Sequence, residues 1–373
     1  MLNRLQNNFS YWRDYKRYKK GGLSTNKAIK QSIFKRMVLS KNNNEDFNIN
    51  NVKKILITRY DRIGDMLFTF PLIELIKKYY PDLTIDIYCS ESNYTLAKCN
   101  NNIDNYFVNN RNNKINAIKT LLMLRKNDYD LVLDMYENRL SNTLMRMKII
   151  NAKYTVGMDK YRKHSFSNEE LENMYLKIYG KDKTKHIISK NLEFLDIFNI
   201  TDKKYTKDIE IPKEYNDYYK SYKKNDKKNI YFNTEGSVMS RTLSVKKVND
   251  ILDNINLENC NLVIVALSKQ FDILNGNIDK NVTLVKVSSI FETISLIKNF
   301  DLIISPDTSI IHFASMFNKK IVGIYSADEM NYMANHPFSD DYKVIRATSE
   351  GNSIKEFDCK EVSQYANEYI EKL

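Results

Sequence analysis

The 373-residue chain is long enough for two ordinary domains, and its composition excludes several classes of protein. Four well-separated cysteines without a C-x-x-C pair argue against a disulfide scaffold or a zinc site, and they favour a reducing compartment. No apolar run approaches the roughly 18 residues that span a bilayer, and the N-terminus lacks the apolar segment of a secretory signal. The formal net charge is +12, of which residues 1–41 alone carry +10.

Residues 1–41 form a basic arm. Eleven Lys and Arg residues accompany a single acid, Asp14, so the rest of the chain carries only +2. Aromatic and aliphatic residues are interleaved with these cations, a pattern typical of an interfacial element that binds anionic lipid. A solvated tail or a helix packed on the body has the same composition, and the sequence leaves these interpretations open. Nucleic acid is not expected as a partner, because no nucleic-acid-binding motif accompanies the arm.

The polar stretch 42–51 predicts a linker, and with the first domain counted from residue 51 the arm and linker cover 1–50. Beyond it, short apolar strands alternate with amphipathic helices, which is typical of open parallel sheets. Strands are expected at 54–58, 84–88, 105–108, 131–134, 155–157, 229–233, 262–267, 283–287, 302–304 and 320–325. Helices are expected at 66–76, 92–99, 114–125, 138–149, 245–255, 290–299, 308–317 and 361–372, and the region 160–225 is expected to be mostly helical with a weak strand at 209–211.

The two alternating runs predict two α/β domains, 51–225 and 226–373, each with its own parallel sheet. The final helix belongs to the second domain or packs back on the first. Ligands of such sheets bind at the carboxyl ends of the strands, so two facing sheets would share one cleft.

The segment 301–312 is the most informative part of the chain for function. An apolar run predicts a buried strand, and either Asp307 or Thr308 can cap the helix that follows, with Asn318 as its left-handed stop. A helix N-terminus at the carboxyl end of a parallel strand gathers backbone N–H groups, so the segment predicts a site for a nucleotide diphosphate. His312 lies one turn inside this helix, and alone it is more typical of a structural histidine.

The loop after the first strand carries Asp65, directly after Gly64. An aspartate at a helix start is commonly a cap, but one at a strand end beside the cleft can serve as a general base. Arg59 and Arg62 flank it, either as ligands of an anionic acceptor or as surface charges.

The loop 233–244 follows the first strand of the second run and contains Gly236 and Arg241. It predicts either a phosphate site built from backbone donors and the guanidinium or a solvated loop. No G-x-G-x-x-G or P-loop motif is present, and no Cys/His spacing suggests a metal.

Three stretches carry a family resemblance. The first is Ile55-Leu-Ile-Thr-Arg59-Tyr-Asp-Arg-Ile-Gly64-Asp65 through Pro71, and the second joins Tyr129-Asp-Leu-Val-Leu-Asp134 to Val156-Gly-Met158. The third and most specific is Ser305-Pro-Asp-Thr-Ser-Ile-Ile-His-Phe-Ala314, followed by Lys320-Ile-Val-Gly-Ile-Tyr325. Over about 54–346 the chain resembles glycosyltransferase family 9, the lipopolysaccharide heptosyltransferases.

The resemblance implies a GT-B fold, in which two Rossmann-like parallel-sheet domains face each other across a cleft, the first binding the acceptor and the second the nucleotide sugar. It implies an inverting glycosyltransferase that moves a heptose from a nucleotide-diphosphate sugar, typically ADP-heptose, to a lipopolysaccharide or lipooligosaccharide core acceptor, without a cofactor or an obligatory metal. Such an enzyme is expected in the cytoplasm, where the basic arm would hold it peripherally at the inner face of the cytoplasmic membrane.

The expected site residues are Asp65 as the catalytic base, Arg59 and Arg62 for the acceptor, and Gly236, Arg241, Asp307, Thr308, Ser309 and His312 for the donor. Four departures from the family pattern surround the donor: Ser309 for Gly, Leu243-Ser244 for Trp-Pro, Ser326-Ala327 for Gly-Pro, and Asn233-Thr-Glu-Gly236 for Pro-Gly-Ala. They leave open another donor in capsule or surface-glycan synthesis, or a non-catalytic sugar-nucleotide-binding protein. A pure binder needs no base, so Asp65 favours the enzyme.

Overall fold

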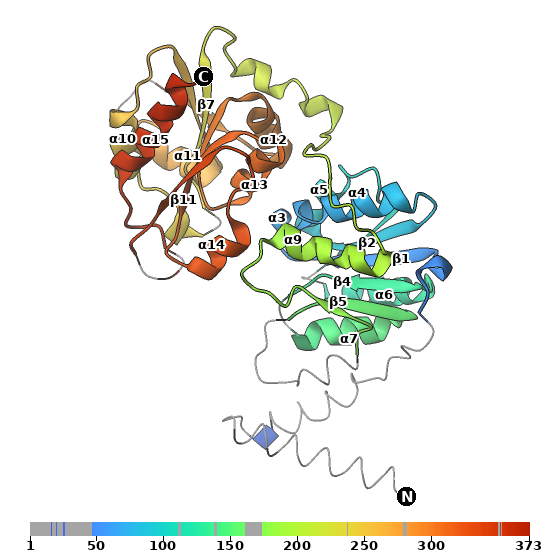
Figure 1. Cartoon of the computed structure of the whole chain (residues 1–373). Helices are drawn as coiled ribbons and strands as arrows, with labels where there is room; N and C mark the ends of the chain where they lie inside the picture. Colours follow the sequence, from blue (N-terminus) through green and yellow to red (C-terminus); the bar gives the residue numbers. More distant parts are fainter. Residues whose placement is uncertain are drawn as a thin grey trace, which may run out of the picture. The chain divides into compact units, whose positions relative to one another are not determined.

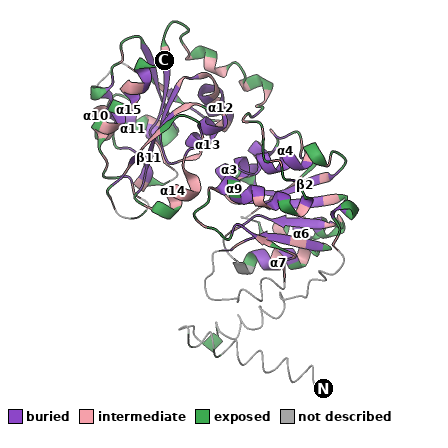
Figure 2. Cartoon of the chain, viewed as in Figure 1, coloured by how far each residue is buried: buried purple, intermediate pink, exposed green. Residues whose placement is uncertain are grey.

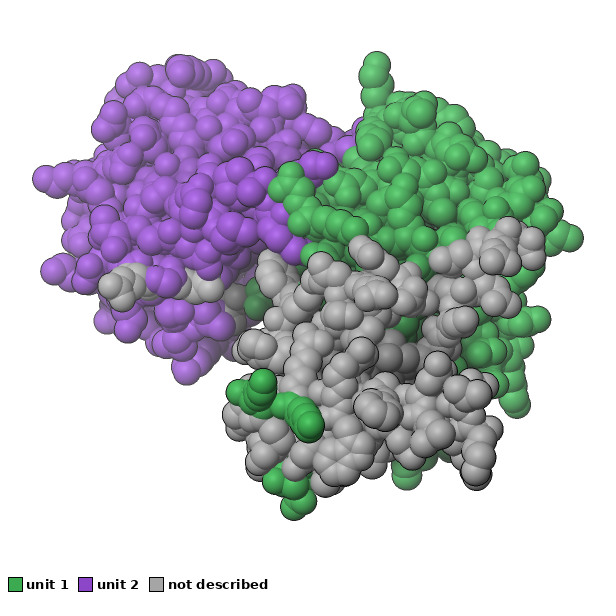
Figure 3. Space-filling view, turned by 60° about the horizontal axis from the view of Figure 1, so that its bottom comes forward, with its two compact units in different colours: residues 1–182, 188–204 green, residues 183–187, 205–373 purple. Residues whose placement is uncertain are grey.

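The structure is a computed structural model that describes residues 47–110, 113–137, 140–160, 174–236, 238–278, 282–349, 351 and 353–373, together with Lys16, Lys20, Thr25 and Asn26. Nearly all of the basic arm and linker therefore lies outside the described residues. The chain divides into two compact units, coloured separately in Figure 3. The first comprises Met1–Asp182 and Ile188–Lys204, and the second Lys183–Ile187 and Tyr205–Leu373.

The first unit is built on a six-stranded parallel sheet with the order β3-β2-β1-β4-β5-β6 (Figure 1). The central strand β1 is buried along nearly its whole length, as a parallel sheet covered on both faces requires (Figure 2). The strands are β1 (Lys54–Arg59), β2 (Thr84–Ser90), β3 (Asn105–Asn109), β4 (Leu131–Asp134), β5 (Tyr154–Met158) and β6 (Ile178–Tyr179).

The helices of the first unit connect these strands. The single helix expected at 66–76 is interrupted, because Pro71 lies in the first turn of a new helix, where its missing N–H has no helical partner to lose. The helices are α3 (Ile63–Leu67), α4 (Phe70–Tyr79), α5 (Glu91–Ala97), α6 (Lys114–Lys126), α7 (Leu140–Ile150) and α9 (Ile187–Leu192), with the 3-10 helices η1 (Ile49–Asn51) and η2 (Glu193–Phe198).

The second unit repeats the architecture with a parallel sheet in the order β12-β11-β10-β7-β8-β9. Counted from the first strand of each unit, the two orders are the same doubly wound topology, so the expected fold class is confirmed. The strands are β7 (Lys228–Asn233), β8 (Cys260–Ala266), β9 (Thr283–Lys286), β10 (Leu302–Pro306), β11 (Lys320–Tyr325) and β12 (Tyr342–Arg346).

The last helix of the second unit lies in that unit's own core. Val362 and Ala366 are fully buried in one apolar cluster with Ile251, and Ser363 Oγ donates to Ile251 O at 2.8 Å. The buried face of this helix therefore belongs to the core of the second unit. The helices are α10 (Val245–Asn254), α11 (Ser268–Leu274), α12 (Ile290–Asn299), α13 (Ser309–Met316), α14 (Glu329–Asn335) and α15 (Cys359–Glu371), with the 3-10 helices η3 (Lys213–Tyr215), η4 (Tyr218–Ser221) and η5 (Met239–Arg241).

The middle of the chain differs from its expected structure. Its described part contains the two-residue strand β6 and short helical segments joined by irregular chain, and no strand forms at 209–211. The compact units divide between Lys204 and Tyr205, whereas the sequence placed the boundary after residue 225. The physical reason is that the 3-10 helices η3 and η4 lie against α12, since Tyr219 N donates to Ser295 Oγ at 3.3 Å.

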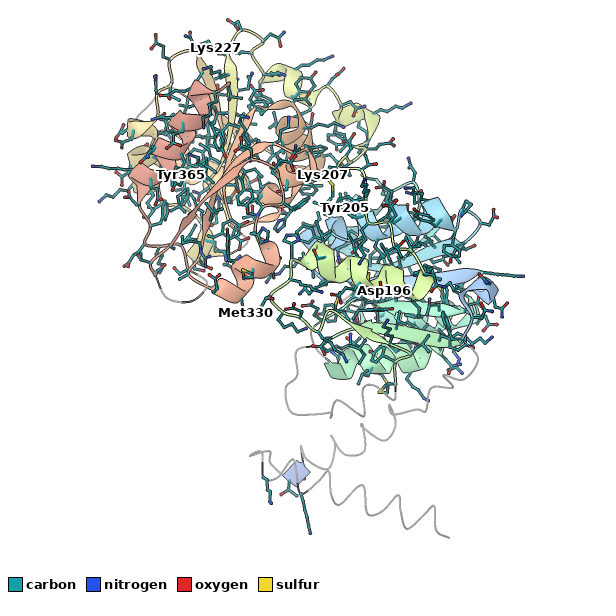
Figure 4. All side chains as sticks on the ribbon, in the orientation of Figure 1. Asp196, Tyr205, Lys207, Lys227, Met330 and Tyr365 are labelled. Atoms are coloured by element: carbon teal, nitrogen blue, oxygen red, sulfur yellow. The ribbon has the colours of Figure 1, made fainter. Side chains whose placement is uncertain are left out.

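Lys207, labelled with Tyr205 in Figure 4, anchors the start of this segment to the second unit by donating to Phe338 O at 3.1 Å. Among the residues that the structure describes, no helix has the length and apolarity needed to cross a membrane.

Each sheet has one point where the strand order reverses direction. In the first sheet it lies between β1 and β4, and in the second between β7 and β10. Ligands of doubly wound sheets bind outside the carboxyl ends of the strands at this point. The loops that follow these four strands carry most of the residues singled out from the sequence, so the fold places them where binding is expected.

Candidate active site

The loops after β7 and β10 meet in a buried ion pair. Arg241 Nη1 donates to Asp307 Oδ2 at 2.9 Å, and both side chains are less than one-tenth exposed. Asn331 Nδ2, from α14, donates to the same oxygen at 2.8 Å. The sequence assigned Arg241 and Asp307 to the donor separately, and the structure joins them into one desolvated pair held by three segments of the second unit.

Gly236 permits the close approach of the loop to Arg241. A Cβ atom on Gly236 would lie 2.3 Å from Arg241 Cβ and 2.5 Å from Arg241 O, distances that real Cβ atoms do not adopt. At the end of β7, Asn233 Nδ2 donates to Ser305 Oγ and to Glu235 O, both at 2.9 Å. These contacts fix the loop to the end of β10 and keep Arg241 close to Gly236.

At the start of α13, one residue caps the helix and one backbone N–H group is already hydrogen-bonded within the sheet. Thr308 is the N-cap, and its Oγ1 accepts from Ile310 N at 3.2 Å. The N–H of Asp307 donates to Ile324 O at 2.9 Å, so it belongs to the sheet and not to a ligand. Among the backbone N–H groups at residues 307–309, those of Thr308 and Ser309 remain candidates for binding a phosphate. Ser309 is the first residue of the helix.

His312 is buried in α13, with 7% of its surface exposed. Burial lowers its pKa to about 3, because desolvation disfavours the imidazolium. The side chain is therefore neutral at physiological pH and cannot bind a phosphate as a cation. The helix ends before Asn318, whose φ of 50° confirms the predicted left-handed stop.

Asp65 lies in the first turn of α3 and is half-buried. Its Oδ2 accepts from Arg62 N at 3.1 Å, so the carboxylate does cap the helix. The hydrogen bonds formed within the described residues use only this oxygen of the carboxylate. The Asp65 side chain can therefore cap the helix through Oδ2 and act as a base through Oδ1, which would take the proton.

Arg59 differs from its expected role. Its side chain is 1% exposed, and the guanidinium is buried under the loop that follows β1. It therefore stabilises this loop and is not exposed to contact an acceptor saccharide. Burial of an arginine requires that its donors find acceptors inside the protein. The acceptors are Asp65 O, Thr69 Oγ1, Asp61 Oδ2, Met135 O and Asn191 Oδ1, at distances of 2.6–3.2 Å. Arg62 is exposed, and its role stays a prediction.

Asp61 is a functional candidate that the sequence reasoning missed. Its Oδ2 lies 3.2 Å from Arg59 Nη1, whereas its buried Oδ1 has no hydrogen-bond partner among the described residues. Burial raises the pKa of this carboxyl to about 7; Arg59 opposes the shift and Asp65 adds to it. Asp61 precedes α3, four positions before Asp65, and this spacing in the sequence does not indicate that its carboxyl is buried.

Replacing Asp61 with Asn should change the pH dependence of stability. The folded protein keeps a proton on Asp61 up to about pH 7, whereas the unfolded chain loses it near pH 4. The folded state binds more protons in that window, so the wild type loses stability as pH rises. The stability of D61N relative to wild type should improve by up to about 4 kcal/mol between pH 4 and pH 8. Urea unfolding at both pH values measures this, and a constant difference would contradict the raised pKa.

A second buried polar network lies at the ends of β4 and β5. Asp134 is fully buried and accepts from Tyr175 OH at 2.7 Å and from Lys160 Nζ at 2.8 Å. Nearby in the same unit, Lys190 Nζ pairs with Glu137 Oε1 at 3.0 Å. These charged groups are paired within the first unit, so they stabilise the loops that follow β4 and β5. The sequence marked Asp134 as a strand end and as part of the second stretch of family resemblance, but it did not indicate this network.

Residues 118–365 match the model of glycosyltransferase family 9 (heptosyltransferase). The chain belongs to this family. It is 25% identical over 293 residues to lipopolysaccharide heptosyltransferase 1 of Campylobacter coli, covering 74% of this chain and 84% of that protein. As a family 9 member the protein is a glycosyltransferase.

Solved structures show the same fold. The family 9 glycosyltransferase of Veillonella parvula superposes with a TM-score of 0.70 at 18% identity, covering 86% of this chain and 98% of the other. The E. coli heptosyltransferase WaaC with ADP superposes with a TM-score of 0.65 at 14% identity, covering 85% and 99%. At these identities the likeness shows the fold alone, and that fold is GT-B, as expected from the sequence.

Proposed function

We propose that this family 9 glycosyltransferase transfers a heptose, with inversion, from ADP-heptose to a core acceptor of lipopolysaccharide or lipooligosaccharide. The observation that carries the proposal is the buried Arg241–Asp307 pair beside the start of α13, at the switch point of the second sheet. The E. coli heptosyltransferase WaaC has been solved with ADP and with ADP-2-deoxy-2-fluoro heptose, which supports this choice of donor.

The proposed reaction is an in-line displacement. Asp65 takes the proton of the acceptor hydroxyl while the oxygen of that hydroxyl forms a bond to the anomeric carbon. The bond from that carbon to the diphosphate oxygen breaks on the opposite side, which inverts the configuration. ADP leaves with the electron pair, and Arg241 and the N–H groups of Thr308 and Ser309 stabilise its charge.

The proposal needs no metal, because Arg241 supplies the positive charge at the diphosphate. Neutral His312 contributes packing beneath the site, since burial removes its charge. Arg62, exposed beside Asp65, is the residue proposed to meet an anionic acceptor. We place the protein in the cytoplasm, peripherally at the inner face of the membrane, where the basic arm would lie beside a lipid-linked acceptor.

A panel of nucleotide sugars tests the donor. A ligand that binds only the folded state stabilises it by about 2.7 kcal/mol at 100 times its Kd. ADP-heptose should therefore raise the melting temperature most, ADP alone should raise it less, and UDP- and CMP-sugars should leave it unchanged. Differential scanning fluorimetry at matched ligand concentrations measures this. A larger shift with a UDP-sugar than with ADP-heptose would contradict the proposed donor.

A further inference from the structure

The helix α6 carries apolar side chains on its outer side as well as on its inner side. Leu121 and Leu124 are buried in the core of the first unit. The outward residues are large and exposed, namely Ile115 at 67%, Ile118 at 54%, Leu122 at 48% and Met123 at 56%. Single exposed apolar residues are ordinary, but four on one helix of thirteen residues form a patch that indicates a contact surface.

The same helix is basic and has no acid. Lys119, Arg125 and Lys126 are exposed, and the sequence from 114 to 126 contains no Asp or Glu. At 100° per residue, Lys119 and Lys126 lie on the same side as Ile115 and Leu122. Long basic side chains can reach past such apolar neighbours to place their charges at the edge of the patch. An outer face that combines apolar residues with cations and carries no acid is typical of a helix that lies in a membrane interface.

We propose that the outer face of α6 (labelled in Figure 2) binds an anionic lipid surface. Charge decides between the candidate occupants. The basic arm carries +10 over residues 1–41, so it would be repelled by the cations of α6. A second copy meeting this face with its own α6 would bring like charges together. Anionic headgroups complement the cations, and the acyl boundary accepts the apolar side chains.

The inference places a membrane contact on the folded body of the enzyme, separate from the arm. Stable attachment to a membrane generally needs two weak signals, and a basic segment with an amphipathic face meets that requirement. The contact does not depend on the identity of the donor, so it can fail while the proposed function stands. A contact through α6 would orient the first unit relative to the bilayer, because the helix is part of the folded unit. An arm that only tethers the protein would not set this orientation.

Vesicle flotation with the full chain tests the inference. The variant I118Q/L122Q removes two apolar anchors and keeps good helix formers on a solvent face. The matched control L267Q/I273Q replaces two exposed apolar residues of the second unit, which are 57% and 41% exposed. Wild type and control should float with vesicles of phosphatidylethanolamine and phosphatidylglycerol. The α6 variant should partition on the order of tenfold less, with an unchanged melting temperature.

Three results would overturn the inference. In the first, the α6 variant floats as well as wild type, which would leave the arm as the attachment. In the second, wild type floats equally with vesicles of phosphatidylcholine alone, which would remove the role of anionic lipid. In the third, wild type sediments as a dimer and the α6 variant as a monomer, which would make the patch an interface between copies.

Discussion

Replacing Asp65 with Asn is expected to lower kcat by about 10²–10⁴-fold, because a positioned general base contributes an effect of that size. The fold should survive, since the amide oxygen of Asn can still accept the hydrogen bond from Arg62 N that caps α3. Initial rates of transfer with saturating donor and acceptor measure the loss. Circular dichroism melting of the same sample separates it from unfolding.

The same experiment distinguishes the two carboxylates of the loop. D65A should lose both the base and the cap, and the lost cap adds a stability cost of about 1 kcal/mol that D65N avoids. D61N keeps Asp65 and its cap in place. If D61N abolished transfer while D65N retained it, the base would be Asp61, and the role given to Asp65 would be contradicted.

Replacing Arg241 with Met is expected to destabilise the second unit by about 3–5 kcal/mol. Removing one partner of a buried ion pair leaves a charge in a desolvated site, and Asp307 is 5% exposed on its side chain. Donor affinity should fall as well, because the charge at the diphosphate is lost. Denaturant unfolding gives the first effect, and calorimetric titration with the donor, carried out below the melting transition, gives the second.

Arg346 provides a matched control within the same unit. It pairs with Glu329 at 3.0 Å, but the side chains are 30% and 68% exposed, so R346M should cost less than about 1 kcal/mol. The double variant R241M/D307N should be less destabilised than the sum of its single variants, because it leaves no unpaired charge. Equal costs for R241M and R346M would show that the Arg241–Asp307 pair is not desolvated as the structure indicates.

The sheets could be predicted because buried parallel strands are recognisable in the sequence. Strands such as β1 and β11 read as unbroken apolar runs, since helices cover both of their faces. The strands that were missed lie at edges. β6 has two residues, and β12 includes Lys343 and Arg346 among partly exposed positions, so neither produces an apolar run. The helix α14 was missed for a similar reason, because none of its residues is buried.

The places of the candidate residues at strand ends could be predicted, but the contacts between them could not. Asp65, Gly236 and Asp307 follow strand ends, and strand ends are visible in the sequence. Partners that meet across a sheet are not, since Arg241 and Asp307 are 66 positions apart and Arg59 meets Asn191 across 132. Arg59 looked like a surface charge for this reason. Asp61 was missed because its importance lies in burial, which only the folded loop creates.

The most direct test of the proposed function is transfer itself. The full chain is incubated with ADP-heptose and a lipopolysaccharide core acceptor that lacks heptose, and the acceptor is analysed by mass spectrometry. We expect the mass of the acceptor to grow by one heptose residue with wild type and to stay unchanged on the same timescale with D65N. Transfer from another nucleotide sugar but not from ADP-heptose, or equal rates for wild type and D65N, would contradict the proposed reaction.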